Sequence, residues 1–205
     1  MKKKILALTL VFALALALGI GGTVAWLTAQ TTPVVNTFTV GDINITLAET
    51  ATDFKMVPGN KIAKDPKVTV RKDSEACWLF VKVEKSTNFE TFMEYEMADG
   101  WTELPDNSGI YYREVAALTA ANAVDTTFSV LSDNKVTVKN TVTKSDMNGL
   151  AEKNADGTPK KDNDGNLVYD DAKLPKLTFT AYAVQKDNIA TAADAWAKVS
   201  TTSNP

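Results

Sequence analysis

The sequence predicts an all-β protein, an antiparallel two-sheet sandwich or jelly-roll-like fold with a short C-terminal helix. Apolar and polar residues alternate along several short segments, which is the period of strands with one buried face. Turn clusters, Pro58-Gly59-Asn60 and Asp106-Asn107-Ser108-Gly109, separate these segments. About seven or eight short strands of this kind are typical of a sandwich. At 44% hydrophobic and 23% charged residues, the 205-residue chain can build a core.

The N-terminus has the pattern of a secretory signal peptide rather than of a strand. Three lysines at 2–4 precede an apolar stretch from Ile5 to about Ile20, and small residues follow at 21–25. The apolar stretch is shorter than the roughly 20 residues that span a bilayer comfortably, so an uncleaved membrane anchor is the lesser alternative. We expect residues 1–25 to be removed by cleavage between Ala25 and Trp26.

Cleavage would change the charge of the chain. The first 25 residues carry three lysines and no acidic residue, so the net charge would fall from −3 to −6. An acidic chain is not expected to bind nucleic acid, which normally selects a basic surface. The signal-peptide pattern and this charge together predict a secreted protein that does not bind nucleic acid.

The first strand changes phase at Gly41. Phe38 and Val40 occupy even positions, whereas the apolar residues of 43–47 occupy odd ones. A one-residue slip at a glycine is typical of a bulge or a tight bend. The sequence thus predicts an extended N-terminal segment, 26–40, separate from a β-sandwich domain at 41–205.

Two central strands have the clearest alternation. In Cys77–Glu84, the odd positions form one apolar face, while Trp78 and Phe80 lie on the other face before it turns polar. We expect Cys77 to be a buried core residue, because no basic side chain adjoins it to lower its pKa. Leu177–Val184 repeats the pattern. Further predicted strands are Phe38–Leu47, Lys67–Arg71, Gly109–Val115, Thr126–Leu131 and Lys135–Val142.

Two segments do not fit the strand pattern. Residues 144–173 are rich in Asp, Asn, Lys and Gly and predict a long surface insertion with a small hairpin at Asp164-Gly165. Thr191 and Asp194 form a capping-box-like start to a helix at Ala192–Val199. We expect this helix to close one end of the sandwich.

Composition excludes most familiar catalytic sites. The chain has no histidine, which excludes Ser-His-Asp triads, Cys-His dyads and His-liganded zinc. Its single cysteine excludes an internal disulfide framework. Asp162-Asn163-Asp164-Gly165 favours a turn over a calcium loop, because Lys160 stands where the first calcium ligand would be needed. We predict no catalytic, cofactor or metal residues, with calcium near Asp162 and Asp164 as the minor alternative.

Two motifs near the N-terminus resemble the TasA/camelysin family of exported bacterial proteins. The first is Gly21-Gly22-Thr23-Val24-Ala25-Trp26, and the second, about ten residues later, is Asn36-Thr37-Phe38-Thr39-Val40-Gly41. Val57-Pro58-Gly59-Asn60 is similar to a short turn of the same family. The resemblance covers roughly the first third of the chain.

The resemblance implies a structural subunit of biofilm matrix fibres. Family members are processed by a SipW-type signal peptidase and assemble by donor-strand exchange, in which the N-terminal segment of one subunit joins the sheet of the next. Carried over to this chain, the implied partners are further copies of itself, that peptidase and an anchoring or accessory matrix protein. The self-assembly residues would be Leu27, Val35, Phe38 and Val40. Pro33 departs from an ideal donor strand, because it lacks an N–H.

Two other functions remain open. Trp78, Trp101, Tyr111 and Tyr112 could form a platform for sugars on a monomeric adhesin or carbohydrate-binding module. An exported peptidase of camelysin type is the lesser alternative, disfavoured by the absence of histidine.

Overall fold

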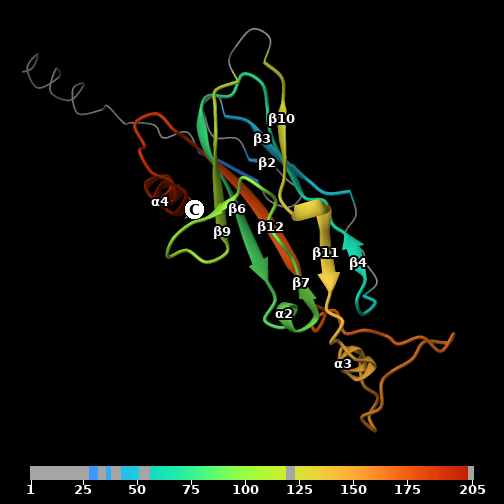
Figure 1. The fold of residues 1–205 in the computed structure, drawn as a ribbon. Helices are drawn as coiled ribbons and strands as arrows, with labels where there is room; N and C mark the ends of the chain where they lie inside the picture. The colour runs from blue at the N-terminus through green and yellow to red at the C-terminus, as the bar shows by residue number, and fades with distance from the viewer. Residues whose placement is uncertain (1–27, 32–35, 38–42, 51–55, 119–122, 203–205) are drawn as a thin grey trace, which may run out of the picture.

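The computed structural model describes residues 28–31, 36–37, 43–50, 56–118 and 123–202, and for 28–31, 36–37 and 200–202 it describes the backbone only. The predicted signal peptide at 1–25 and the start of the predicted strand at Phe38 lie outside these residues. The described strands are all antiparallel and form three sheets, which confirms the all-β prediction (Figure 1).

The largest sheet has six strands in the order β2-β1-β12-β6-β9-β8. Its centre is the pair formed by β12 (Leu177–Gln185) and β6 (Cys77–Lys85), which runs from Leu177 opposite Lys85 to Gln185 opposite Cys77. The remaining strands are β2 (Asn36–Thr37), β1 (Thr28–Thr31), β9 (Ile110–Val115) and β8 (Thr102–Glu103).

Alternation along β6 sorts its side chains as predicted. Cys77, Leu79, Val81 and Val83 belong to one buried cluster, whereas Trp78 and Phe80 belong to a second. β12 does the same, with its odd residues from Phe179 to Ala183 in the first cluster and Tyr182 and Val184 in the second. The large sheet is therefore buried on both faces along these two strands.

The other two sheets have three strands each. One has the order β10-β5-β3, and the other has the order β4-β11-β7. Their strands are β10 (Thr126–Ser129), β5 (Lys67–Val70), β3 (Ile45–Ala48), β4 (Lys61–Ala63), β11 (Lys135–Val138) and β7 (Met93–Glu94).

Backbone chemistry explains why these two sheets are separate. β4 and β5 follow one another in sequence and form one run, and β10 and β11 form a second run. β5 pairs with β10 and β4 pairs with β11, and a break separates the two pairs. Pro66 lies at the break and has no N–H to donate, although its carbonyl accepts from the Val130 amide at 3.0 Å. On the other run, a 3-10 turn at Ser132–Asn134 takes the place of strand. The ladder is thus interrupted in the middle of both runs.

The main core lies between the large sheet and the two small ones. Its buried side chains come from all three: Leu79, Val81 and Phe179 from the large sheet, Ile45, Val68 and Val70 from β3 and β5, and Ile62, Val136 and Val138 from β4 and β11.

The C-terminal helix is present but does not close an end of the fold. α4 (Ala192–Thr202) begins with the predicted cap, since the Thr191 hydroxyl accepts from the Asp194 amide at 3.1 Å. Ala195 and Val199 pack into the second cluster with Phe80. The helix therefore covers the outer face of the large sheet (Figure 1). The physical reason is that Trp78, Phe80 and Tyr182 make this face apolar and require a cover.

The polar segment 144–173 contains more regular structure than predicted. It begins with α3 (Lys144–Gly149), capped by Thr143 and Asp146, and continues into two tight turns. The other short helix, α2 (Phe89–Phe92), follows β6. Figure 1 shows the segment extending away from the sheets beyond α3.

Candidate functional site

The most distinctive site is the edge of the large sheet where β1 pairs with β12. Thr28 lies opposite Val184, Ala29 opposite Ala183 and Gln30 opposite Tyr182. β1 then pairs with β2, with Gln30 opposite Thr37 and Thr31 opposite Asn36. The N-terminal segment thus supplies the two strands at one edge of the large sheet, with β2 outermost.

Hydrogen bonds show which residues of β12 face this edge. The Ser86 amide donates to the Lys176 carbonyl, and the Lys186 amide donates to the Ala76 carbonyl, both in the register of the β6–β12 pair. The Val83 amide points the other way, to Gly109. Because bonding alternates along an antiparallel strand, even-numbered residues of β12 bond to β6, and odd-numbered residues direct their amides and carbonyls to the β1 side.

This edge is buried wherever β1 lies against it. The side chains of Ala183 and Val184 are completely buried, and Tyr182 is 9% exposed. An edge of this kind presents unpaired backbone groups next to a hydrophobic core unless a strand covers it. β1 supplies that strand from the same chain.

The residues predicted for cleavage and self-assembly lie outside the described part of the chain. These are Ala25, Trp26, Leu27, Val35, Phe38 and Val40. The strands β1 and β2 fall within the predicted extended segment 26–40, but their pairing with the chain's own sheet was missed by sequence reasoning. Strands of two to four residues are too short to produce a readable alternation.

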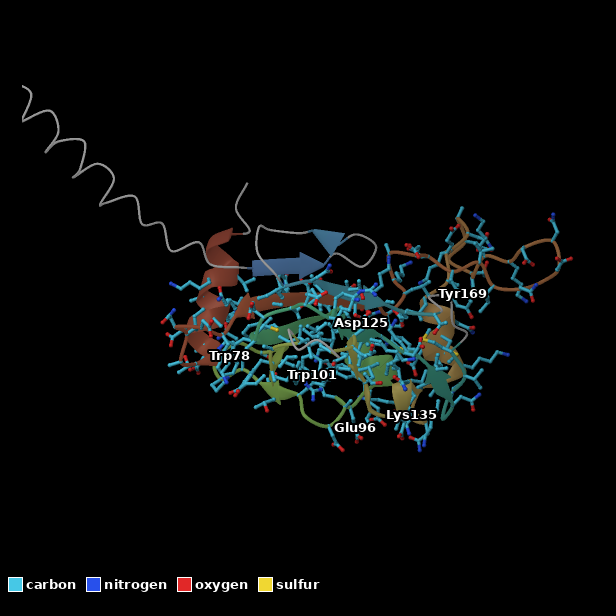
Figure 2. All side chains as sticks on the ribbon, turned by 90° about the horizontal axis from the view of Figure 1, so that it is seen from above. Trp78, Glu96, Trp101, Asp125, Lys135 and Tyr169 are labelled. Carbon is cyan, nitrogen blue, oxygen red and sulfur yellow. The ribbon has the colours of Figure 1, made fainter. Side chains whose placement is uncertain are left out.

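The four aromatic residues of the alternative sugar platform do not share a surface and pack in or against two separate cores. Trp78 and Tyr112 belong to the cluster beneath α4, with ring centroids 5.9 Å apart, whereas Trp101 and Tyr111 belong to the main core. Trp78 is only 5% exposed and Trp101 only 9%. Figure 2 shows the two tryptophans apart, with Trp78 beside α4. Alternation along β6 and β9 sends neighbouring aromatic side chains to opposite faces.

The lone cysteine is a core residue, as predicted. Cys77 is completely buried and has no disulfide partner. Burial raises the pKa of its thiol to about 12, because a thiolate is poorly solvated in an apolar environment. This thiol therefore lacks the lowered pKa that a nucleophilic cysteine needs.

The Asp162–Asn166 segment forms a turn. The Asp162 carboxylate accepts from the amides of Asp164 and Asn166, at 3.0 and 2.8 Å. These hydrogen bonds lower the pKa of Asp162. The preceding turn at Asn154–Thr158 has the same backbone bonds, so the two turns form a short repeat. No group of three or more potential metal-ligating side chains occurs within the described residues.

Comparison with known proteins adds no relative. No family model, no curated protein and no solved structure matches the chain. Among the helices that the structure describes, none has the length and apolar character needed to cross a bilayer.

Proposed function

We propose that this protein is a secreted structural subunit of extracellular fibres in a bacterial biofilm matrix, with a jelly-roll-like body. In this proposal it assembles by exchange of its N-terminal strand. The observation that carries the proposal is the pairing of β1 with the buried edge of β12, close behind the predicted cleavage junction. The resemblance of the N-terminal motifs to the TasA/camelysin family supports the same conclusion.

Exchange costs little contact energy, because the contacts of β1 can be made equally well by a second copy. β1 of a neighbouring subunit can occupy the same register, with its Ala29 opposite Ala183. Every backbone bond broken within one chain is then remade between chains, and the local concentration of subunits decides between the two forms. Each subunit gives one strand and receives one. When donor and recipient are different copies and the rotation between them does not close a ring, the contact is head-to-tail and produces an open filament.

Export sets the order of events in this mechanism. Before cleavage, the segment leading into β1 remains joined to the apolar signal sequence at the membrane. Cleavage between Ala25 and Trp26 by a SipW-type signal peptidase frees the strand. The subunits then polymerise outside the cell, where an anchoring or accessory matrix protein attaches the fibre.

A monomeric adhesin is the second candidate, and one observation favours it. The chain already covers its own β12 edge, so a folded monomer has no open site at Tyr182–Val184. Tyr169, 44% exposed on the projecting insertion, is an aromatic contact that such a module could use (Figure 2). Binding to glycans by a protein that stays monomeric at high concentration would support this candidate.

Electron microscopy separates these candidates. The chain Trp26–Pro205 is expected to form filaments at high concentration, whereas a chain that begins at Gly41 is expected to form none. Circular dichroism of the shorter chain checks that it retains its strands. Filaments from both chains, or from neither, contradict the proposal.

A disulfide tests the pairing itself. In the variant Ala29→Cys with Ala183→Cys, the two new cysteines stand opposite each other in the register. Oxidation of the dilute monomer is expected to close a bond within the chain and to block assembly. Oxidation of preformed filaments is expected to produce a ladder of covalent oligomers on a non-reducing gel, and the single variant Ala29→Cys is the control.

A further inference from the structure

A cleft of about 310 Å³ lies beside the end of β6, between the large sheet and β7. Most of its lining comes from the segment 89–97, which runs from α2 through β7, and from the facing residues Lys85 of β6 and Tyr111 of β9. Figure 1 shows α2 and β7 together where β6 ends. We call this the Tyr95 cleft, after the tyrosine within that segment. Its volume lies at the lower end of the range of small-molecule sites.

The Tyr95 cleft combines an apolar floor with two phenol hydroxyl groups. Phe89 and Met93 are buried, and Met97 packs against the main core. The rings of Phe89 and Tyr95 meet edge to face, with centroids 6.0 Å apart. Burial raises the pKa of both Tyr95 and Tyr111, and each phenol also affects the pKa of the other. Both hydroxyl groups are therefore protonated at neutral pH and can donate as well as accept hydrogen bonds.

The charges of the cleft do not suit a cationic ligand. The Lys85 Nζ atom lies 5.9 Å from the ring centroid of Tyr95, which is the position that a bound cation would take over this ring. Lys139 adds a second positive charge to the lining. A cationic group would therefore meet two like charges.

An anionic ligand does not suit the cleft either. Both lysines are already bonded to Glu90, since Lys85 pairs with its carboxylate and Lys139 donates to its backbone carbonyl. The carboxylate of Glu94 also lines the cleft and is exposed. In the part of the chain that the structure describes, the Glu94 side chain has neither an ion pair nor a hydrogen bond. An anion would have to displace Glu90 and would also meet the negative charge of Glu94.

We propose that the Tyr95 cleft binds one neutral hexose residue of a polysaccharide. A pyranose ring carries hydroxyl groups that both donate and accept hydrogen bonds, and its C–H faces pack on aromatic and apolar side chains. The hydroxyl groups of Tyr95 and Tyr111 and the carboxylate of Glu94 supply the polar contacts, and Phe89 and Met97 supply the apolar ones.

This inference goes beyond the proposed structural role and does not rest on strand exchange. The lining of the cleft contains no residue of β1, β2 or β12. A subunit with such a site would hold polysaccharide whether it is a monomer or part of a filament.

Binding of end-labelled oligosaccharides, measured by fluorescence polarisation in dilute protein, tests the proposal. The neutral probes are cellohexaose, laminarihexaose, maltohexaose and mannohexaose. The hexamers of galacturonate and of chitosan are the anionic and cationic comparisons. We expect at least one neutral probe to bind more tightly than both charged ones, by about tenfold or more, because a charge would lose solvation without gaining a partner. If no neutral probe binds, or if a charged probe binds more tightly, the inference is overturned.

Two variants assign the binding to the cleft. Tyr95→Phe removes a hydroxyl group and keeps the ring, and Glu94→Gln removes a charged acceptor from an exposed side chain. Each is expected to weaken binding of the neutral probe by about three- to tenfold. Tyr169→Phe is the matched control, because it removes the hydroxyl group of a tyrosine that is 44% exposed on the insertion. Circular dichroism checks that the variants fold, and unchanged affinity in both cleft variants contradicts the inference.

Hydrogen exchange locates the site independently. A saturating neutral probe is expected to slow exchange of the amides of 89–97 and to leave those of α4 unchanged. Protection confined to the insertion 144–173, with affinity lost only in Tyr169→Phe, would overturn the cleft and place the sugar contact on the insertion. Either result leaves strand exchange to be judged by the filaments alone.

Discussion

The indole Nε1–H of Trp78 donates to the backbone carbonyl of Ile189 at 3.1 Å, and both groups are buried. The bond joins the start of β6 to the segment just before α4. Ile189 itself packs in the cluster beneath the helix. Trp78 therefore fixes the position from which α4 crosses the outer face of the large sheet.

Replacing Trp78 by Phe should loosen α4. The Ile189 carbonyl loses its buried donor, and we expect the free energy of unfolding to fall by about 1–3 kcal/mol. Hydrogen exchange should show faster exchange of the amides of α4. Trp101→Phe is the matched control, because it also removes an indole bond, to the Ser129 carbonyl at 2.8 Å, but on the opposite face. Equal loss of protection at α4 in both variants would contradict the role of Trp78.

Gly100 leaves room for a cationic side chain over aromatic rings. The Arg113 guanidinium lies 3.9 Å from the ring centroid of Phe128 and 5.3 Å from that of Trp101. A Cβ on Gly100 would come within 2.7 Å of its Nη2 atom. Burial lowers the pKa of Arg113, in keeping with a guanidinium that is partly removed from water.

We expect Gly100→Ala to destabilise the fold more than Gly157→Ala. Both glycines have positive φ, 85° and 83°, so both variants carry backbone strain of about 1–3 kcal/mol. Gly157 has no heavy atom within 4 Å of its built Cβ, whereas Gly100 faces Arg113. The difference between the free energies of unfolding of the two variants in urea measures the cost of displacing Arg113. Equal effects would show that Arg113 moves aside without loss.

Cys77 should make the stability depend on pH in the alkaline range. The pKa of the thiol is raised from 9.0 to about 12. Between these values the unfolded chain releases the proton and the folded chain keeps it, so stability is complete below pH 9 and falls as pH rises. The slope is at most about 1.4 kcal/mol per pH unit for this one group.

The matched variant is Cys77→Ala, which should have a shallower decline in denaturant unfolding between pH 9 and 10.5. In the native protein at pH 8, Cys77 should react with a thiol reagent only after denaturation. Rapid reaction of the folded protein would contradict the burial of this side chain.

Capping of α4 should matter more than capping of α3. Thr191→Ala removes the acceptor for the Asp194 amide and should cost about 1 kcal/mol. Thr143→Ala removes the equivalent cap of α3, whose Asp146 amide donates to Thr143 at 3.2 Å. No residue of α3 is buried, so this change should leave the thermal midpoint nearly unaltered. A larger shift for Thr143→Ala would mean that the insertion stabilises the body.

The long, alternating segments could be predicted from the sequence because their periodicity is local. The two faces of β6 and β12 and the cap at Thr191 all follow from residues close together in the chain. The predicted strands at Lys67, Gly109, Thr126 and Lys135 each contain an observed strand, although each observed strand is shorter. The short strands β4, β7 and β8 were missed, since two or three residues hold too little pattern.

The sequence by itself determined an all-β chain without a histidine site, a buried cysteine and a C-terminal helix, because composition and alternation decide these. Only the tertiary structure decided that the helix covers a face and that the aromatic residues are divided between two cores. Only the tertiary structure also decided that β1 pairs with the edge of β12, where Ala29 lies opposite Ala183 although the two residues are far apart in sequence. Such pairings depend on which backbone edges remain open after the sheets have formed, and residue order does not record that.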